Sequence, residues 1–187
     1  WRPTQLVGTR VTGKTLGLIG FGRIGRAVAK RARQGFGMRV LFHDPYASDA
    51  DATALGAERR PSVEAVLAES HIVSLHCPAT PETHHLMNAA RLARMRPGAL
   101  LINTSRGDVV DEPALVRALE AGAIGGAGLD VFEREPAVSP GLLAFDNVVL
   151  LPHLGSATEE TRVAMGNRAI DNLCTFFEGG APHDRVA

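Results

Sequence analysis

The sequence predicts an α/β protein built on a doubly wound parallel sheet with helices on both faces. Two observations predict this fold. Short apolar runs alternate with helix-length amphipathic stretches, and the first apolar run leads directly into the glycine-rich segment Gly20-Phe21-Gly22-Arg23-Ile24-Gly25. Short apolar runs are typical of parallel strands buried on both faces, and the stretches between them are long enough for crossover helices.

Six apolar runs are predicted as strands, because each is bounded by turn-forming or polar residues. They cover residues 16–19, 38–42, 72–75, 99–103, 126–129 and 148–151. The chain has 187 residues, of which 45% are hydrophobic and 21% charged, a composition typical of a soluble globular domain. We therefore expect one domain over residues 1–187.

Helices are predicted between the strands. The first begins near Arg23 and stops at Gly35 or Gly37. Its apolar face, from helical spacing, comprises Ile24, Ala27, Val28 and Ala32. Ser62 is predicted to cap a helix through Ala68. Asp111 is predicted to cap another through Leu119, with Pro113 in its first turn.

The last helix is predicted to begin at Ser156, because Ser156 and Glu159 have the spacing of a capping box. Its apolar stripe, which we expect to be core, comprises Val163, Ile170, Leu173, Cys174 and Phe177. Residues 179–187 are expected to fray at the chain end.

The glycine-rich segment predicts a dinucleotide site in a Rossmann-type sheet. Gly20 permits a tight turn, Gly22 lets a pyrophosphate approach the backbone, and Gly25 allows the helix to pack on the strand. The amides at the helix start, at Arg23 and Ile24, would hold the pyrophosphate. The alternative is a glycine-rich turn that binds no ligand.

Asp44 follows Gly25 by nineteen residues, at the end of the second predicted strand. A carboxylate at this place accepts hydrogen bonds from the adenosine ribose. It favours NAD over NADP, because a 2′-phosphate would meet a like charge and residues 45–48 include no arginine. The alternative is that Asp44 only ends a strand before a proline.

Composition argues against several other classes of function. Twenty Lys and Arg balance twenty Asp and Glu, so the basic excess of nucleic-acid-binding proteins is missing. No apolar run reaches the roughly 20 residues of a membrane helix, and the first residues do not resemble a signal peptide, so we expect a cytoplasmic protein. Cys77 and Cys174 lack metal-ligand spacing and are expected to be reduced thiols, with no metal site.

Five longer motifs resemble those of the D-isomer-specific 2-hydroxyacid dehydrogenases, through nearly the whole chain. They are GLIGFGRIG at 17–25, HCPATPET at 76–83, LINTSRGDVVDEPAL at 101–115, GLDVFEREP at 128–136 and LPHLGSAT at 151–158. The last motif is most similar to the glyoxylate and hydroxypyruvate reductases. The resemblance implies an NAD-dependent enzyme that transfers a hydride between NAD(H) and a small D-2-hydroxy acid or 2-keto acid.

Arg106, Glu135 and His153 suit this chemistry. Arg106 follows a strand at the edge where open α/β sheets bind ligands, and its planar fork fits a carboxylate. His153 follows the last strand and can exchange a proton near neutral pH. Glu135 would hydrogen-bond His153 and raise its pKa. The resemblance implies the same three roles, whereas each residue taken alone also fits a structural or surface position.

The resemblance implies further cofactor contacts. It places Cys77, Pro78, Thr83 and Thr104 along the nucleotide and Asp130 near the nicotinamide carboxamide. The alternatives are a small buried hydrophobe for Cys77, and caps or turn formers for the Thr and Asp side chains.

The resemblance also implies a homodimer and a separate substrate domain, toward which residues 157–187 would lead as a helix and return segment. If that substrate domain is absent, the isolated piece is expected to bind NAD but to turn over poorly. One alternative is an NAD(H)-sensing corepressor-type protein that uses the same domain. Another is a formate dehydrogenase, which would carry Gln in place of Glu135.

Overall fold

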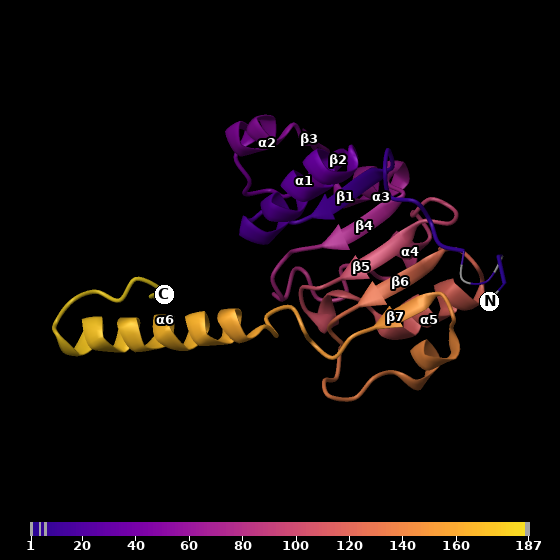
Figure 1. The fold of residues 1–187 in the computed structure, drawn as a ribbon. Helices are drawn as coiled ribbons and strands as arrows, with labels where there is room; N and C mark the ends of the chain where they lie inside the picture. The colour runs from indigo at the N-terminus through magenta and orange to yellow at the C-terminus, as the bar shows by residue number, and fades with distance from the viewer. Residues whose placement is uncertain (1, 4, 6, 186–187) are drawn as a thin grey trace. The chain divides into compact units, whose positions relative to one another are not determined.

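The computed structural model describes residues 2–3, 5 and 7–185, shown as a ribbon in Figure 1. The chain forms two compact units, one up to Pro152 and one from His153 onward, and each is described by itself. Among the described residues, no helix is long and apolar enough to cross a membrane.

Within the described residues of the first unit, seven parallel strands form one sheet in the order β3-β2-β1-β4-β5-β6-β7 (Figure 1). The strands are β1 (Thr15–Ile19), β2 (Arg39–His43), β3 (Glu58–Arg59), β4 (Ile72–Leu75), β5 (Leu100–Asn103), β6 (Gly126–Leu129) and β7 (Val148–Leu150). The strand order runs outward in both directions from β1 and β4, which confirms the doubly wound sheet. All six predicted strands are present with bounds within one residue.

The seventh strand, β3, was not predicted. It has two polar residues and pairs with the outer side of β2, Leu41 opposite Glu58 and Phe42 opposite Arg59. A short edge strand needs no apolar run, so hydrophobic periodicity gives no signal for it.

The helices of the first unit are α1 (Arg23–Phe36), α2 (Asp49–Leu55), α3 (Val63–Glu69), α4 (Ala89–Leu92) and α5 (Glu112–Glu120), with short 3₁₀ turns at Gly107–Val109 and Pro140–Ala144. The two predicted caps are confirmed. Ser62 accepts a hydrogen bond from the Ala65 amide at 3.2 Å, and Asp111 accepts one from the Ala114 amide at 2.9 Å. Helices α2 and α4 were not predicted.

The core lies on both faces of the sheet, which confirms that helices cover both. On one face, the apolar side chains of β1 and β2 pack with α1 and α2 through Leu16, Leu18, Ala29, Ala32, Val40, Phe42 and Ala52. On the other, β4, β5 and β6 pack with α3, α4 and α5 through Val66, Leu67, Val73, Leu75, Leu92, Leu101, Leu115 and Leu129.

The predicted apolar face of α1 is confirmed for Ala32, which is buried, and for Val28, which is partly buried against the core, but it was wrong for Ile24 and Ala27. The buried residues are Gly25, Ala29 and Ala32, whereas the Ile24 side chain is 65% exposed and Ala27 is exposed too. Gly25 must face the strand, because a Cβ there would stand 2.4 Å from the carbonyl oxygen of Gly20. The face of α1 that packs on the sheet therefore includes Gly25 rather than Ile24.

The second unit consists mainly of α6 (Glu159–Phe177). Its cap is Thr158, whose hydroxyl accepts a hydrogen bond from the Thr161 amide at 3.2 Å, and not the predicted Ser156, which lies in the turn before it. The expectation that the stripe from Val163 to Phe177 forms core was also wrong. Among the described residues, α6 contains no buried side chain, and Cys174 is exposed with the rest.

Candidate functional site

The glycine-rich loop follows β1, next to the segment that follows β4, at the point where the strand order reverses. Gly20 has a φ of 93°, and a Cβ there would stand 2.6 Å from the carbonyl carbon of His76. The amide of His76 in turn donates to the carbonyl of Ile19 at 2.7 Å. Only glycine permits both the turn and this close approach of the two backbones.

The start of α1 leaves room for a pyrophosphate. A Cβ at Gly22 would meet no described atom within 4 Å, so the space beside this residue is open. In the described structure Gly22 caps α1 without a side-chain hydrogen bond, and the first turn carries no acidic residue. The uncapped amides and the positive end of the helix dipole fit the phosphates of a dinucleotide.

Asp44 ties the end of β2 to the glycine-rich loop. Its Oδ2 accepts a hydrogen bond from the Phe21 amide at 2.7 Å, and its Oδ1 accepts one from the Tyr46 amide at 2.8 Å. The carboxylate is half-buried, and each oxygen can accept a further hydrogen bond, for example from a ribose hydroxyl.

An arginine lies beside this loop, although the residues after Asp44 include none. Arg59, on β3, donates to the carbonyl oxygens of Asp44 and Ala47, both at 2.5 Å, and pairs with the Asp49 carboxylate at 2.8 Å. Its guanidinium also stacks 4.9 Å above the Phe42 ring. These contacts hold the loop closed, and sequence proximity could not reveal them because β3 was not predicted.

The loop after β4 is half-buried and held by its own hydrogen bonds. Burial lowers the pKa of His76 to about 4 and raises the pKa of the Cys77 thiol to about 11, so both are neutral at pH 7. The Thr83 hydroxyl accepts from the Thr80 amide at 2.8 Å and donates to the Pro78 carbonyl at 2.6 Å. Thr83 thus stabilises the turn of this loop, and its contact with the nucleotide stays a prediction.

Arg106 lies in a turn that the side chain of the buried Asn103 stabilises through hydrogen bonds. Asn103, 1% exposed at the end of β5, donates from Nδ2 to the Arg106 carbonyl at 2.9 Å and accepts from the Ser105 amide at 3.0 Å. Thr104 and Arg106 are exposed, and the Arg106 guanidinium donates to the Ser105 carbonyl at 2.6 Å. Asn103 was not among the predicted site residues, although an Asn that ends a buried strand before a Thr-Ser pair is a signal for such a turn.

The turn with Arg106 and the loop with Glu135 are in direct backbone contact. A Cβ at Gly107 would stand 1.9 Å from the carbonyl carbon of Phe132. The Phe132 amide donates to the Glu135 carboxylate at 3.0 Å, which folds that side chain back over its own loop. Asp130, buried to 5% exposure, begins this loop, and its amide donates to the Asn103 carbonyl at 3.0 Å. The structure therefore brings Arg106, Asp130 and Glu135 to one edge of the sheet.

His153 is the first residue of the second unit. It is exposed and has a φ of 55°, an uncommon conformation for a residue with a side chain. The hydrogen bond between Glu135 and His153 stays a prediction.

Both cysteines are free, and burial accounts for the high pKa of Cys77. Among the residues that the structure describes, no group of three or more His, Cys, Asp or Glu side chains could hold a metal ion.

Comparisons with known proteins place this geometry in a family. The family described as "D-isomer specific 2-hydroxyacid dehydrogenase, NAD binding domain" matches residues 1–155. The glyoxylate reductase of Thermococcus litoralis is 47% identical over 186 residues, which are 100% of this chain and 56% of that protein. The chain thus spans little more than half the length of the curated relatives it matches.

Two solved structures have the same fold. A glyoxylate reductase from Paecilomyes thermophila is 41% identical with a TM-score of 0.87, over 94% of this chain and 52% of that one. An NADPH-dependent glyoxylate/hydroxypyruvate reductase from Sinorhizobium meliloti, in complex with NADP and malonate, is 42% identical with a TM-score of 0.88, over 94% of this chain and 53% of that one. The family match covers most of the chain, and the glycine-rich loop and the start of α1, which has no side-chain cap, agree with it. This chain therefore belongs to the D-isomer specific 2-hydroxyacid dehydrogenase family and comprises its NAD binding domain.

Proposed function

We propose that the full-length protein is an NAD-dependent D-2-hydroxyacid dehydrogenase that reduces small 2-keto acids, with glyoxylate and hydroxypyruvate as the favoured substrates. The observation that carries this proposal is the contact between Gly107 and Phe132, which joins the turn of Arg106 to the loop of Glu135. This contact lies at the carboxyl edge of the sheet, where the glycine-rich loop also ends. Several relatives at 47 to 49% identity are named glyoxylate reductase, which supports the substrate class.

The chain's own residues would hold the cofactor. The amides of Arg23, Ile24 and Gly25 bind the pyrophosphate, and Asp44 accepts a ribose hydroxyl. When bound, the reduced nicotinamide supplies the hydride that reduces the keto carbon. Because Asp44 repels a 2′-phosphate, we propose NADH as the preferred reductant, in contrast to the NADPH-dependent relative from Sinorhizobium meliloti.

Three side chains would serve the substrate. Arg106 binds the carboxylate of the 2-keto acid through its guanidinium fork. His153 donates a proton to the carbonyl oxygen as negative charge develops there. Glu135 hydrogen-bonds the imidazole and keeps its pKa high enough for His153 to be protonated before reduction. Cys77, Pro78, Thr83, Thr104 and Asp130 are proposed as further cofactor contacts.

We also propose that the full-length protein acts in the cytoplasm as a homodimer, with no nucleic acid or membrane as partner. The resemblance to the family supports the dimer. The balanced charge supports the exclusion of nucleic acid.

The test is steady-state kinetics of the full-length protein with NADH and NADPH on glyoxylate, hydroxypyruvate, pyruvate and phenylglyoxylate. Arg106→Met is compared with Arg94→Met, which removes another exposed arginine from a position outside the proposed site. We expect Arg106→Met to lower kcat/KM by about 100-fold or more, because it loses a charge-assisted hydrogen-bonding pair with the substrate. Arg94→Met should retain the wild-type value.

Three results would contradict the proposal. Equal activity of Arg106→Met and Arg94→Met would remove Arg106 from the site. Tight NADH binding without reduction of any 2-keto acid would favour the sensor function. A strong preference for NADPH would overturn the role of Asp44.

A further inference from the structure

A buried carboxylate next to the site has no part in the chemistry proposed above. Glu112, in the first turn of α5, is only 6% exposed. Burial of a carboxylate is costly unless hydrogen bonds and dipoles compensate for the lost water. Its position at the start of a helix provides a favourable dipole, and its Oε1 accepts a hydrogen bond from the Glu133 amide at 2.7 Å. The buried group thus holds the backbone two residues before Glu135.

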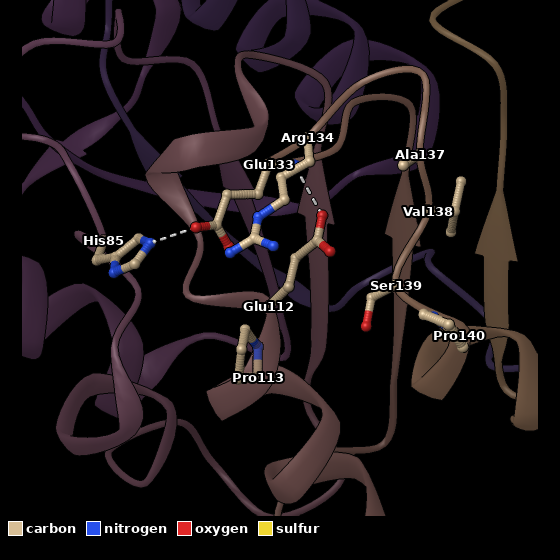
Figure 2. A pocket seen from close by; sticks show the side chains of 9 residues that line it. All are labelled: His85, Glu112, Pro113, Glu133, Arg134, Ala137, Val138, Ser139 and Pro140. Atoms are coloured by element: carbon tan, nitrogen blue, oxygen red, sulfur yellow. Dashed lines mark hydrogen bonds and ion pairs between the residues drawn. The ribbon is translucent and has the colours of Figure 1, made fainter.

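A second contact holds the side chain of Glu133. The Glu133 carboxylate lies 3.1 Å from Nε2 of His85, which comes from the loop after β4. The His85 amide donates to the Asp108 carbonyl at 2.8 Å, and His85 has a φ of 47°. His85 is therefore held in place by the turn that follows Arg106. Figure 2 shows Glu133 between His85 on one side and Glu112 on the other.

The loop between Glu133 and Pro140 borders open space. A cavity of about 450 Å³ lies here, and Figure 2 shows the side chains that line it. They are His85, Glu112, Pro113, Glu133, Arg134, Ala137, Val138, Ser139 and Pro140. The packed Phe132 side chain holds the start of the loop, and beside the cavity we expect the polar contacts of Glu133 to fix the backbone that follows.

We propose that Glu112 is a positioning residue for Glu135 and acts through the Glu133 amide, with His85 as a secondary support. The inference rests on the proposed function. Glu112 touches neither substrate nor cofactor in this proposal. Its hydrogen bond fixes the loop, so that the Glu135 carboxylate, itself bonded to the Phe132 amide at 3.0 Å, keeps the place that the proposed function requires of it.

The experiment measures the pH dependence of keto-acid reduction by the full-length protein and four variants. Glu112→Ala removes the acceptor, whereas Glu112→Gln keeps an oxygen in the same place. His85→Asn removes the contact to Glu133, and Asn tolerates the positive φ of this position. Glu120→Ala is the matched control, because Glu120 lies on the same helix and is exposed.

For Glu112→Ala we expect kcat to fall about 10- to 100-fold while KM changes less than about 3-fold, because a small displacement of a catalytic group is costly. The apparent pKa that limits reduction at alkaline pH should fall by about one unit, because the proposed function assigns to the Glu135 carboxylate the task of keeping the proton donor charged. Glu112→Gln should restore kcat to within about 3-fold of the wild type, and His85→Asn should give a smaller change in the same direction. Glu120→Ala should match the wild type.

A merely structural role predicts a different pattern. If Glu112→Ala only lowers the folded fraction, kcat falls equally at every pH and the apparent pKa stays unchanged, and this would overturn the proposal. If Glu112→Ala does not fold, His85→Asn decides the proposal. An unchanged apparent pKa of reduction in that variant would then overturn it. An inactive wild-type protein would refute the proposed function itself, whereas an active wild type with unshifted variants would refute only the positioning role.

Discussion

The substitution Gly107→Ala is expected to destabilise the protein and to separate the two loops that carry Arg106 and Glu135. The added Cβ would stand 1.9 Å from the carbonyl carbon and oxygen of Phe132 and 2.4 Å from the Glu133 nitrogen. All three are backbone atoms, so no side-chain rotation can relieve the overlap. Phe132 is buried to 7% exposure and resists displacement.

The size of the effect follows from the overlap. To restore an ordinary contact of 3.4 Å, the backbones must move apart by about 1.5 Å, the difference between 3.4 and 1.9 Å. Overpacking of a buried site costs about 1–3 kcal/mol, and a clash between two backbones belongs at the upper end, so we expect a loss of about 3 kcal/mol. A displacement of this size should also lower kcat by about 100-fold, because it moves two of the three proposed catalytic groups.

The assay is calorimetric unfolding of the full-length protein, in which the transition of this domain is identified by its shift when NADH is added. Gly35→Ala is the matched control. A Cβ there meets no described atom within 4 Å, and alanine in a helix should stabilise α1 by about 0.5 kcal/mol. The reasoning is refuted if Gly107→Ala unfolds within about 0.5 kcal/mol of the wild type, a difference typical of surface substitutions.

Three further outcomes are expected. Gly22→Ala should leave the unfolding temperature unchanged but weaken NADH binding about 10-fold in a fluorescence titration, because its Cβ enters open space that the pyrophosphate needs. Asp44→Asn should improve NADPH binding relative to NADH about 10-fold by calorimetry, since a like charge is removed while Arg59 remains beside the loop. Burial lowers the pKa of His76 to about 4, so the unfolded chain takes up a proton between pH 6.5 and 4 that the folded chain does not. The stability from neutral His76 is therefore complete above pH 6.5 and is lost as the pH falls toward 4, and His76→Gln should flatten this part of the stability curve.

The strands and the cofactor loop could be predicted because their signals are local. A buried parallel strand must be apolar along its whole length, and a tight turn that opens a helix needs glycine at set positions. The structure shows why glycine is needed at each position. Gly20 has a positive φ, Gly22 borders open space, and Gly25 lies in close contact with the backbone of the strand end. The two-residue strand β3 has neither signal, because it is polar and lies at the edge of the sheet.

Two helix caps were also predicted correctly and one was not. Ser62 and Asp111 were predicted because a side chain that accepts from an amide three residues later is a local arrangement. Ser156 and Thr158 both have the residue type of a cap, and the backbone before α6 decides for Thr158. Helical spacing alone also does not determine whether the apolar stripe of α6 is buried, and in the structure its large side chains, such as Ile170 and Phe177, are exposed.

The sequence by itself determined the fold class, the family and the candidate residues, because strand periodicity and short motifs are written in consecutive positions. Only the tertiary structure decided which segments meet. Gly107 contacts Phe132, Glu112 holds the Glu133 amide and Arg59 closes the loop of Asp44, each across more than ten residues of chain. Contacts of this kind depend on how the strands are ordered and how their loops return across the sheet, and no local pattern of hydrophobicity or charge records that arrangement.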